Sequence, residues 1–270
     1  MDTQQFTENN DYLMLAFDHR ENFKKYINPQ FPEKVTDEET VDAIKEIIKS
    51  TKNDFSGILL DDKYSLSAYR ELGIDKPVVL PLEKSSYELV DNEKITVQDK
   101  EPAEIKVLGA GAGKFLIYFD PKLNSADEKT ELAKKVIEQS HQEGLPIFLG
   151  IISEDTQNYE RVIDSVEYFL KKNIIPDVFV LEFPGSDYLC RKVSNSLGAV
   201  PWIMLSGGAD YVLFREQLKI AADNGCRGFV IGRSLWQEYF DIAEPERKKH
   251  FLEFTLPLRF SEIKDIVKNS

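Results

Sequence analysis

The chain has 270 residues, of which 42% are hydrophobic and 30% are charged, and these proportions are typical of a globular protein. Its formal net charge of −13 argues against nucleic acid and anionic membrane surfaces as partners, because both would be repelled. Residues 1–11 are polar and acidic, and no apolar run approaches the ~20 residues of a membrane span. We therefore expect no membrane partner and a cytoplasmic location.

Eight short apolar runs follow one another along the chain and predict strands. They are continuous rather than alternating, which is typical of parallel strands covered on both faces. The runs are YLMLAF (12–17), SGILL (56–60), PVVLPL (77–82), KFLIYF (114–119), PIFLGII (146–152), DVFVLEF (177–183), PWIML (201–205) and GFVIG (228–232).

Helical segments lie between these runs. Apolar residues recur at helical spacing in 38–51, and Ser125 with Glu128 predicts a capping box at the start of a helix over 125–144. Further helices are predicted at 158–173, at 210–225 and, with a kink near Pro257, within 244–269. Eight strands with intervening helices predict a single (β/α)8 barrel over residues 12–270, preceded by a polar tail over 1–11. A doubly wound open sheet is the alternative, although no Gly-x-Gly-x-x-Gly motif follows a strand.

Residues 83–112 break this alternation. ITVQDK (95–100) predicts an extra strand or hairpin. GAGAG (109–113) precedes a strand and lacks the Lys-Ser/Thr ending of a phosphate loop, so it is interpreted as a flexible turn.

In a barrel of this kind the active site lies at the carboxyl ends of the strands, and each predicted strand ends in polar residues. In chain order these are Asp18-His19-Arg20, Asp61-Asp62-Lys63, Glu83-Lys84-Ser85, Asp120, Ser153-Glu154, Glu182, Ser206-Gly207-Gly208 and Gly232-Arg233-Ser234. Strand ends are often exposed and polar without any function, so this asymmetry favours a functional face but does not prove one.

The last two strand ends predict a phosphate-binding site. Gly207 and Gly208 would let backbone N–H groups approach an anion after Ser206. Arg233, after Gly232, could donate two hydrogen bonds to a phosphate. Two ordinary tight turns are the alternative interpretation.

Other candidates are less specific. Asp18 could serve as an acid or base, or could form a structural salt bridge with Arg20. Asp61, Asp62 and Asp120 could hold a divalent cation, although nothing in their spacing fixes a geometry.

The cysteines and histidines predict no redox or metal site. Cys190 and Cys226 lie in no motif and are expected to be buried thiols. His19, His141 and His250 lack the spacing of metal ligands. We therefore expect no metal and no cofactor.

Several segments together resemble the class I tagatose-bisphosphate aldolases and, more closely, the 2-deoxy-5-keto-gluconate 6-phosphate aldolase-like domains. The resemblance covers nearly all of 12–266 and rests on LMLAFDHRENF, GILLDDKYS, LPLEKSS, KFLIYFD and LSGGADYVLFREQLKIAADNGCRGFVIGRSLW. It implies a barrel that cleaves a phosphorylated ketose through a lysine Schiff base, without metal. It also implies phosphate contacts at Ser206, Gly207, Gly208, Gly232 and Arg233, and copies of the chain that can associate as a homo-oligomer.

The sequence departs from this family at two adjacent strands. The Schiff-base lysine expected on strand six is replaced by Val180, and a glutamate expected inside strand five is replaced by Gly150. Glu182 shares a face with Val180 because strand residues alternate, so it is predicted at the mouth as an acid or base.

Two other lysines could supply the amine. The transaldolase branch carries its lysine on strand four, where this chain has Lys114. Lys114 precedes Asp120 by about 20 Å of strand at ~3.3 Å per residue, which places it deep unless the strand enters the mouth early. Lys84 follows strand three at the rim and is expected to be more solvated.

Three functions therefore stay open. The first is an aldolase-like carbon–carbon lyase acting on a sugar phosphate. The second is a catalytically inactive homologue that binds a sugar phosphate as a sensor or partner subunit. The third is a different enzyme on the same barrel, an isomerase or a metal-assisted lyase.

Overall fold

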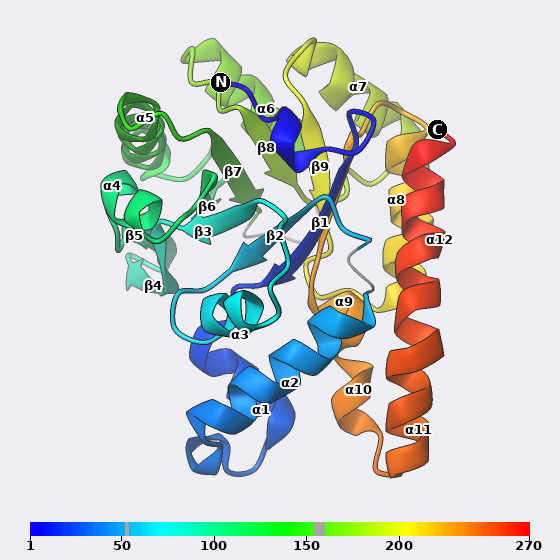
Figure 1. The fold of residues 1–270 in the computed structure, drawn as a ribbon. Coiled ribbons are helices and arrows are strands. Elements are labelled where there is room, and N and C mark those ends of the chain that lie inside the picture. The colour runs from blue at the N-terminus through cyan, green and yellow to red at the C-terminus, as the bar shows by residue number, and fades with distance from the viewer. Residues whose placement is uncertain (52–53, 154–159) are drawn as a thin grey trace.

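A closed barrel of parallel strands forms the centre of the molecule in the computed structural model, which describes residues 1–51, 54–153 and 160–270 (Figure 1). Within those ranges the strand order around the barrel is β1-β10-β9-β8-β7-β6-β3-β2. Because β1 pairs with both β2 and β10, the barrel prediction is confirmed and the open sheet is excluded. The barrel strands are β1 (Tyr12–Phe17), β2 (Gly57–Leu60), β3 (Val78–Pro81), β6 (Ala112–Tyr118), β7 (Ile147–Ile152), β8 (Val178–Leu181), β9 (Trp202–Leu205) and β10 (Gly228–Ile231).

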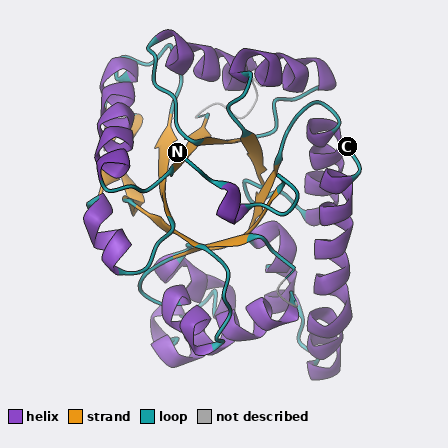
Figure 2. Ribbon diagram, turned by 45° about the horizontal axis from the view of Figure 1, so that its top comes forward, coloured by secondary structure: helices purple, strands orange, loops and turns teal. Residues whose placement is uncertain are grey.

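Apart from Lys114 in β6, the strands are almost entirely apolar because both of their faces are buried. In β8, Val178 and Val180 belong to the cluster inside the barrel, whereas Phe179 and Leu181 pack outward beneath the helices. The helices surround the ring of strands in Figure 2. They are α1 (Lys24–Ile27), α2 (Asp37–Ser50), α3 (Ser65–Glu71), α4 (Pro102–Val107), α5 (Ala126–Gln142), α6 (Glu160–Lys171), α7 (Asp187–Leu197), α8 (Tyr211–Ala222), α9 (Arg233–Trp236), α10 (Glu238–Asp241), α11 (Pro245–His250) and α12 (Leu256–Lys268).

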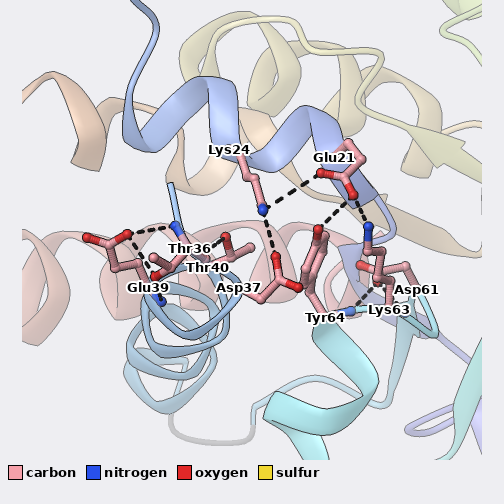
Figure 3. Close-up of polar contacts among 9 residues, drawn as sticks. All are labelled: Glu21, Lys24, Thr36, Asp37, Glu39, Thr40, Asp61, Lys63 and Tyr64. Carbon is pink, nitrogen blue, oxygen red and sulfur yellow. Dashed lines mark hydrogen bonds and ion pairs between the residues drawn. The ribbon is translucent and has the colours of Figure 1, made fainter. Parts of the chain in front are cut away.

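Local capping fixes where some of these helices begin. Thr36 and Glu39 form a capping box before α2, with Glu39 N donating to Thr36 Oγ1 at 3.1 Å and Thr36 N donating to Glu39 Oε2 at 2.8 Å (Figure 3). Such a cap contributes about 1 kcal/mol. The capping box predicted at Ser125 is wrong, because Ser125 makes no side-chain cap bond and instead donates to the Glu93 carboxylate.

An antiparallel hairpin interrupts the barrel between β3 and α4. It consists of β4 (Glu83–Val90) and β5 (Glu93–Gln98), which confirms the strand predicted around residues 95–100. Its Tyr87 ring packs edge-on against Tyr118 of β6, with centroids 5.1 Å apart. The flexible turn predicted over 109–113 is wrong in its second half, because Ala112 and Gly113 already belong to β6.

The N-terminal segment, predicted as a polar tail, closes the amino end of the barrel (Figure 2). It forms a short 3-10 helix, η1 (Gln4–Phe6), and Phe6 is fully buried inside the barrel with its ring 5.3 Å from that of Phe148. The Phe6 carbonyl accepts a hydrogen bond of 2.7 Å from Ser56 Oγ, which in turn accepts one from Leu13 N. Burial of the ring therefore anchors this segment.

The C-terminal segment runs along one side of the barrel (Figure 1). It consists of α11, a π-helical turn over Phe251–Thr255 and α12, which begins just before Pro257. The π-helical turn lies just before Pro257, where a kink was predicted. Cys190 and Cys226 are both free and buried, and burial raises the pKa of each thiol to about 12. Of the helices that the structure describes, none is long and apolar enough to cross a membrane.

Candidate active site

Two adjoining cavities open at the carboxyl ends of the strands. One, of about 170 Å³, runs from the mouth into the barrel interior. The other, of about 470 Å³, lies between the hairpin and the segment after β1. The residues that line both are Asp18, His19, Lys114, Leu116 and Arg233. The junction of the two cavities is therefore the candidate active site.

Lys114 is held at this junction by two carboxylates. Its Nζ lies 2.6 Å from Asp18 Oδ2, which follows β1, and 2.8 Å from Glu83 Oε1, which begins β4. All three side chains are largely buried. These three residues form a buried charge cluster. Removal of the Lys114 ammonium would leave the two carboxylates buried without their counter-ion, which is strongly destabilising.

The cluster fixes the protonation state of its members. Burial alone would lower the pKa of Lys114, but Asp18 and Glu83 outweigh it and raise the pKa above the ordinary value of a lysine. Burial would raise the pKa of Asp18, but Lys114 and His19 outweigh it and bring it to about 2. In the free protein Lys114 is consequently an ammonium and Asp18 a carboxylate.

The stagger of the barrel strands explains how Lys114 reaches the mouth. Lys114 is the third residue of β6, yet it pairs in register with Pro81, the last residue of β3. Strands in a barrel are sheared relative to one another, so an early residue of β6 lies level with the end of β3. The expectation that Lys114 lies deep is thus corrected, because β6 enters the mouth early.

Glu83 is the member of the cluster that the sequence pattern does not distinguish as a catalytic residue. It was identified only as a strand end, and its role depends on the hairpin, which turns its side chain toward Lys114. Its Oε1 binds Lys114, whereas its Oε2 is buried without a hydrogen-bond partner among the described residues. An unpaired buried carboxylate oxygen is unfavourable, and a ligand hydroxyl could satisfy it.

Arg20 supports the base of the hairpin. Its Nη2 donates to the Glu83 carbonyl at 3.1 Å and its Nη1 lies 3.5 Å from Asp99 Oδ2. The Asp18–Arg20 salt bridge considered from the sequence is replaced by these contacts and by the Asp18–Lys114 pair. Arg20 has a φ of +49°, a left-handed conformation that is uncommon for a residue with a side chain and that clusters at functional sites.

The predicted phosphate-binding residues come together on the opposite wall of the inner cavity. Ser206, Gly207, Gly208, Gly232 and Arg233 all line it. Gly207 and Gly208 have φ values of +58° and +81°, and a Cβ on Gly208 would lie 2.8 Å from Arg233 Nη2. Glycine is therefore required at 208 both for the turn and for the position of the guanidinium.

His19 stands between the carboxylate cluster and Arg233. Its ring packs edge-on against Trp236, with centroids 5.3 Å apart, and its buried Nδ1 lacks a partner among the described residues. Burial lowers the pKa of His19 to about 4, and Arg233 and Lys114 add to this effect while Asp18 opposes it. His19 is therefore a neutral imidazole at neutral pH.

Two other candidates lie away from the junction. Glu182 accepts a hydrogen bond of 2.7 Å from Ser153 N and is not among the residues that line either cavity. Burial raises its pKa, and the Ser153 bond opposes the rise. Lys84 is exposed and lines only the outer cavity. Glu154, also a predicted strand end, lies outside the described residues.

The aspartates considered for a cation are engaged elsewhere. Asp61 accepts hydrogen bonds from the backbone N–H groups of Lys63 and Tyr64 and so caps the turn before α3 (Figure 3). Asp62 pairs with Lys100, and Asp120 pairs with Arg161. Within 1–51, 54–153 and 160–270, no group of three or more acidic, histidine or cysteine residues could hold a metal ion.

Val180 and Gly150 line the inner cavity on β8 and β7, which lie between β9 and β6 around the barrel. They are register partners on β8 and β7, so the positions at which the family resemblance implies a lysine and a glutamate lie side by side. Neither residue offers a group that could react with a carbonyl.

The chain matches the DeoC/LacD family aldolase model over residues 12–238. It is 25% identical over 306 residues to the tagatose 1,6-diphosphate aldolase 2 of Streptococcus agalactiae, covering 97% of this chain and 93% of that one. It is 24% identical over 307 residues to the tagatose 1,6-diphosphate aldolase of Lactococcus lactis, covering 98% and 93%. The fold resembles that of an archaeal fructose 1,6-bisphosphate aldolase, with a TM-score of 0.69, 17% identity and coverage of 99% and 98%.

Proposed function

Because this chain belongs to the DeoC/LacD family of aldolases, we propose that it cleaves a carbon–carbon bond in a phosphorylated ketose, with Lys114 as the cation that binds the substrate carbonyl. The observation that carries the proposal is that Lys114 and Arg233 line one cavity together with the glycine turn after β9. A phosphorylated carbonyl compound could reach both charges at once.

The phosphate would bind at Arg233 and at the backbone N–H groups of Gly207 and Gly208. A guanidinium can donate two hydrogen bonds to a phosphate, and successive N–H groups in a left-handed turn form an anion-binding concavity. A local positive site of this kind is compatible with the net charge of −13.

Bond cleavage would follow from the charges of the cluster. Glu83 Oε2 accepts the proton of the hydroxyl group β to the carbonyl, and that oxygen forms the carbonyl of the released product. The electrons of the breaking carbon–carbon bond form the enolate double bond, and the π electrons of the original carbonyl move to its oxygen. The Lys114 ammonium stabilises the resulting enolate oxygen, and the Glu83 carboxyl returns the proton to the enolate carbon. One donor placed at a developing oxyanion is worth about 10²–10³ in rate.

Charge rather than a Schiff base is the proposed role of the amine. A Schiff-base lysine needs a lowered pKa so that its amine is free, whereas the carboxylates raise the pKa of Lys114. We also infer that Val180 replaces the strand-six lysine of the family, since it lines the cavity beside Gly150.

The test is cleavage of a panel of phosphorylated β-hydroxy ketones, including tagatose 1,6-diphosphate, with and without borohydride. We expect carbonyl products without borohydride, and full activity in protein that has been incubated with substrate and borohydride and then freed of both before the assay, because borohydride also reduces free ketones. A reduced adduct on Lys114, found by peptide mass spectrometry, would assign a Schiff base instead. The absence of product from every member of the panel would refute the lyase proposal.

A second candidate function is a catalytically inactive homologue that binds a sugar phosphate as a sensor or partner subunit. The observation in its favour is that no amine lining the inner cavity other than the ion-paired Lys114 occurs among the described residues. Calorimetry separates the two candidates, because binding of the phosphorylated ketones without turnover would support this one. Loss of that binding in Arg233→Ala should accompany either function.

A further inference from the structure

The inner cavity has a polar end and an apolar end. Its five polar lining residues are Asp18, His19, Lys114, Ser206 and Arg233. Four of these follow the ends of strands, and the fifth, Lys114, turns its amine toward Asp18. Below them the wall is apolar. We call this lower part the inner chamber, which is formed by Met14, Leu59, Val79, Phe148, Val180 and Ile203.

The inner chamber offers no hydrogen-bonding side chain to a ligand. Its residues belong to the apolar cluster inside the barrel, and the backbone groups of strands are occupied by pairing with their neighbours. A hydroxylated carbon chain placed there would leave its hydroxyl groups unpaired, and burial of an unpaired hydroxyl is unfavourable.

The size of the cavity suits a compact apolar group. Apolar cavities of about 150 Å³ stay free of water and bind benzene. The whole inner cavity, its polar end included, has about 170 Å³, so the chamber below the polar end has room for one small apolar group. Gly150 keeps this space open, because it lies on the wall between Phe148 and Ile152 and contributes no side chain. The outer cavity, in contrast, is lined by Lys84, Ser85 and Thr96 of the hairpin, which can bind hydroxyl groups.

We propose that the inner chamber binds an apolar group of the substrate, a branched alkyl group or a six-membered ring, while the phosphate lies at Arg233 and any hydroxylated part lies in the outer cavity. The assignment of the phosphate rests on the proposed function. The chamber itself rests only on the lining of the barrel. The substrate class is thus a phosphorylated carbonyl compound with one deoxygenated end, rather than a ketose hydroxylated along its whole length.

The experiment compares the affinities of inorganic phosphate, cyclohexyl phosphate and inositol 1-phosphate by calorimetry. The last two share a six-membered carbon ring and differ only in its hydroxyl groups. An apolar group in a fitted pocket is worth about 10- to 200-fold, so we expect cyclohexyl phosphate to bind at least tenfold more tightly than inorganic phosphate. The proposal is overturned if it binds no more tightly than inorganic phosphate.

Two variants locate the effect. Gly150→Leu fills the chamber, and its Cβ would lie 3.3 Å from Leu116 Cγ, a contact that a small shift of a flexible side chain relieves. We expect it to remove the advantage of cyclohexyl phosphate over inorganic phosphate. Val180→Thr keeps the side-chain size but replaces a methyl group by a hydroxyl group, so it should weaken the binding of cyclohexyl phosphate and strengthen that of inositol 1-phosphate. Unchanged affinities in both folded variants would contradict the assignment.

Benzene binding tests the inner chamber independently of the proposed function, because benzene has no group that would bind Lys114 or Arg233. Saturation with benzene should raise the Tm of the unmodified protein and leave that of Val180→Thr less affected. No rise in the unmodified protein would refute the chamber while leaving the cleavage proposal intact. A rise without cleavage of any phosphorylated ketone would refute only the lyase.

Discussion

Removal of the buried ammonium by Lys114→Met should destabilise the protein in a manner that depends on pH. Lys114 and His19 together outweigh burial and lower the pKa of Asp18 from 3.8 to about 2, a shift that corresponds to about 2–3 kcal/mol. Glu83 loses its partner as well, and loss of one member of a buried ion pair costs about 3–5 kcal/mol. We therefore expect a loss of about 3 kcal/mol at pH 7.

The sign of the pH dependence follows from the direction of the Asp18 shift. In the unmodified protein the lowered pKa contributes stability above pH 3.8, and this contribution is lost as the pH falls toward 2. In Lys114→Met, burial without the Lys114 counter-ion raises the pKa of Asp18, so protonation of Asp18 as the pH falls below 7 relieves the unpaired charge. The gap between the two proteins should be largest at pH 7 and should narrow as the pH falls.

Urea unfolding at pH 7 and pH 4 measures this difference in the free energy of unfolding. In thermal unfolding at pH 7, the same difference should lower the Tm by roughly 6–12 °C. Lys114→Met with Asp18→Asn is the matched control, because it removes one unpaired carboxylate and should recover part of the loss. A gap below about 1 kcal/mol at pH 7, or one that does not change with pH, would refute the charge cluster.

Four further predictions concern the phosphate site, His19 and the closed end of the barrel. Gly208→Ala should lower phosphate affinity because the added Cβ would meet Arg233. The control is Gly144→Ala, at a similar φ of +77° with nothing within 4 Å, which should lose only about 1 kcal/mol of stability and keep its phosphate affinity. Equal phosphate affinities in the two variants would argue against Arg233 as the ligand. Arg233→Ala should weaken phosphate binding about 10- to 150-fold, as measured by calorimetry. The His19 imidazole should remain neutral from pH 8 down to about pH 5, because burial lowers its pKa to about 4, and an NMR titration midpoint near 6.5 would be inconsistent with that burial. Phe6→Ala should cost about 3–5 kcal/mol in thermal unfolding without changing phosphate affinity.

The barrel was predictable from the sequence because strands buried on both faces leave continuous apolar runs. Seven of the eight predicted runs contain their barrel strand in full, and the eighth, 114–119, overlaps β6, which begins two residues earlier at Ala112. The hairpin was predictable only in part, because β4 is exposed along seven of its eight residues and so lacks an apolar pattern. Phe6 was missed because a single aromatic residue among polar neighbours has no periodic signal.

The site was predictable from the sequence where its residues lie together within one turn of the chain. The glycine pairs and Arg233 needed only their local sequence. The Lys114 cluster joins three residues that are far apart in the chain, and its geometry depends on the stagger between β3 and β6, which residue patterns do not encode. For that reason Lys114 was expected too deep and Glu83 was not selected.

The most direct measurement of the central claim is the cleavage rate of the phosphorylated ketone panel by the unmodified protein, Lys114→Arg and Lys114→Met. If Lys114 acts through its charge, Lys114→Arg should retain a measurable fraction of the rate, and Lys114→Met should lose at least 10²-fold. Equal rates in all three proteins would contradict the assignment of Lys114, and complete loss in Lys114→Arg with borohydride trapping in the unmodified protein would contradict the role of its charge.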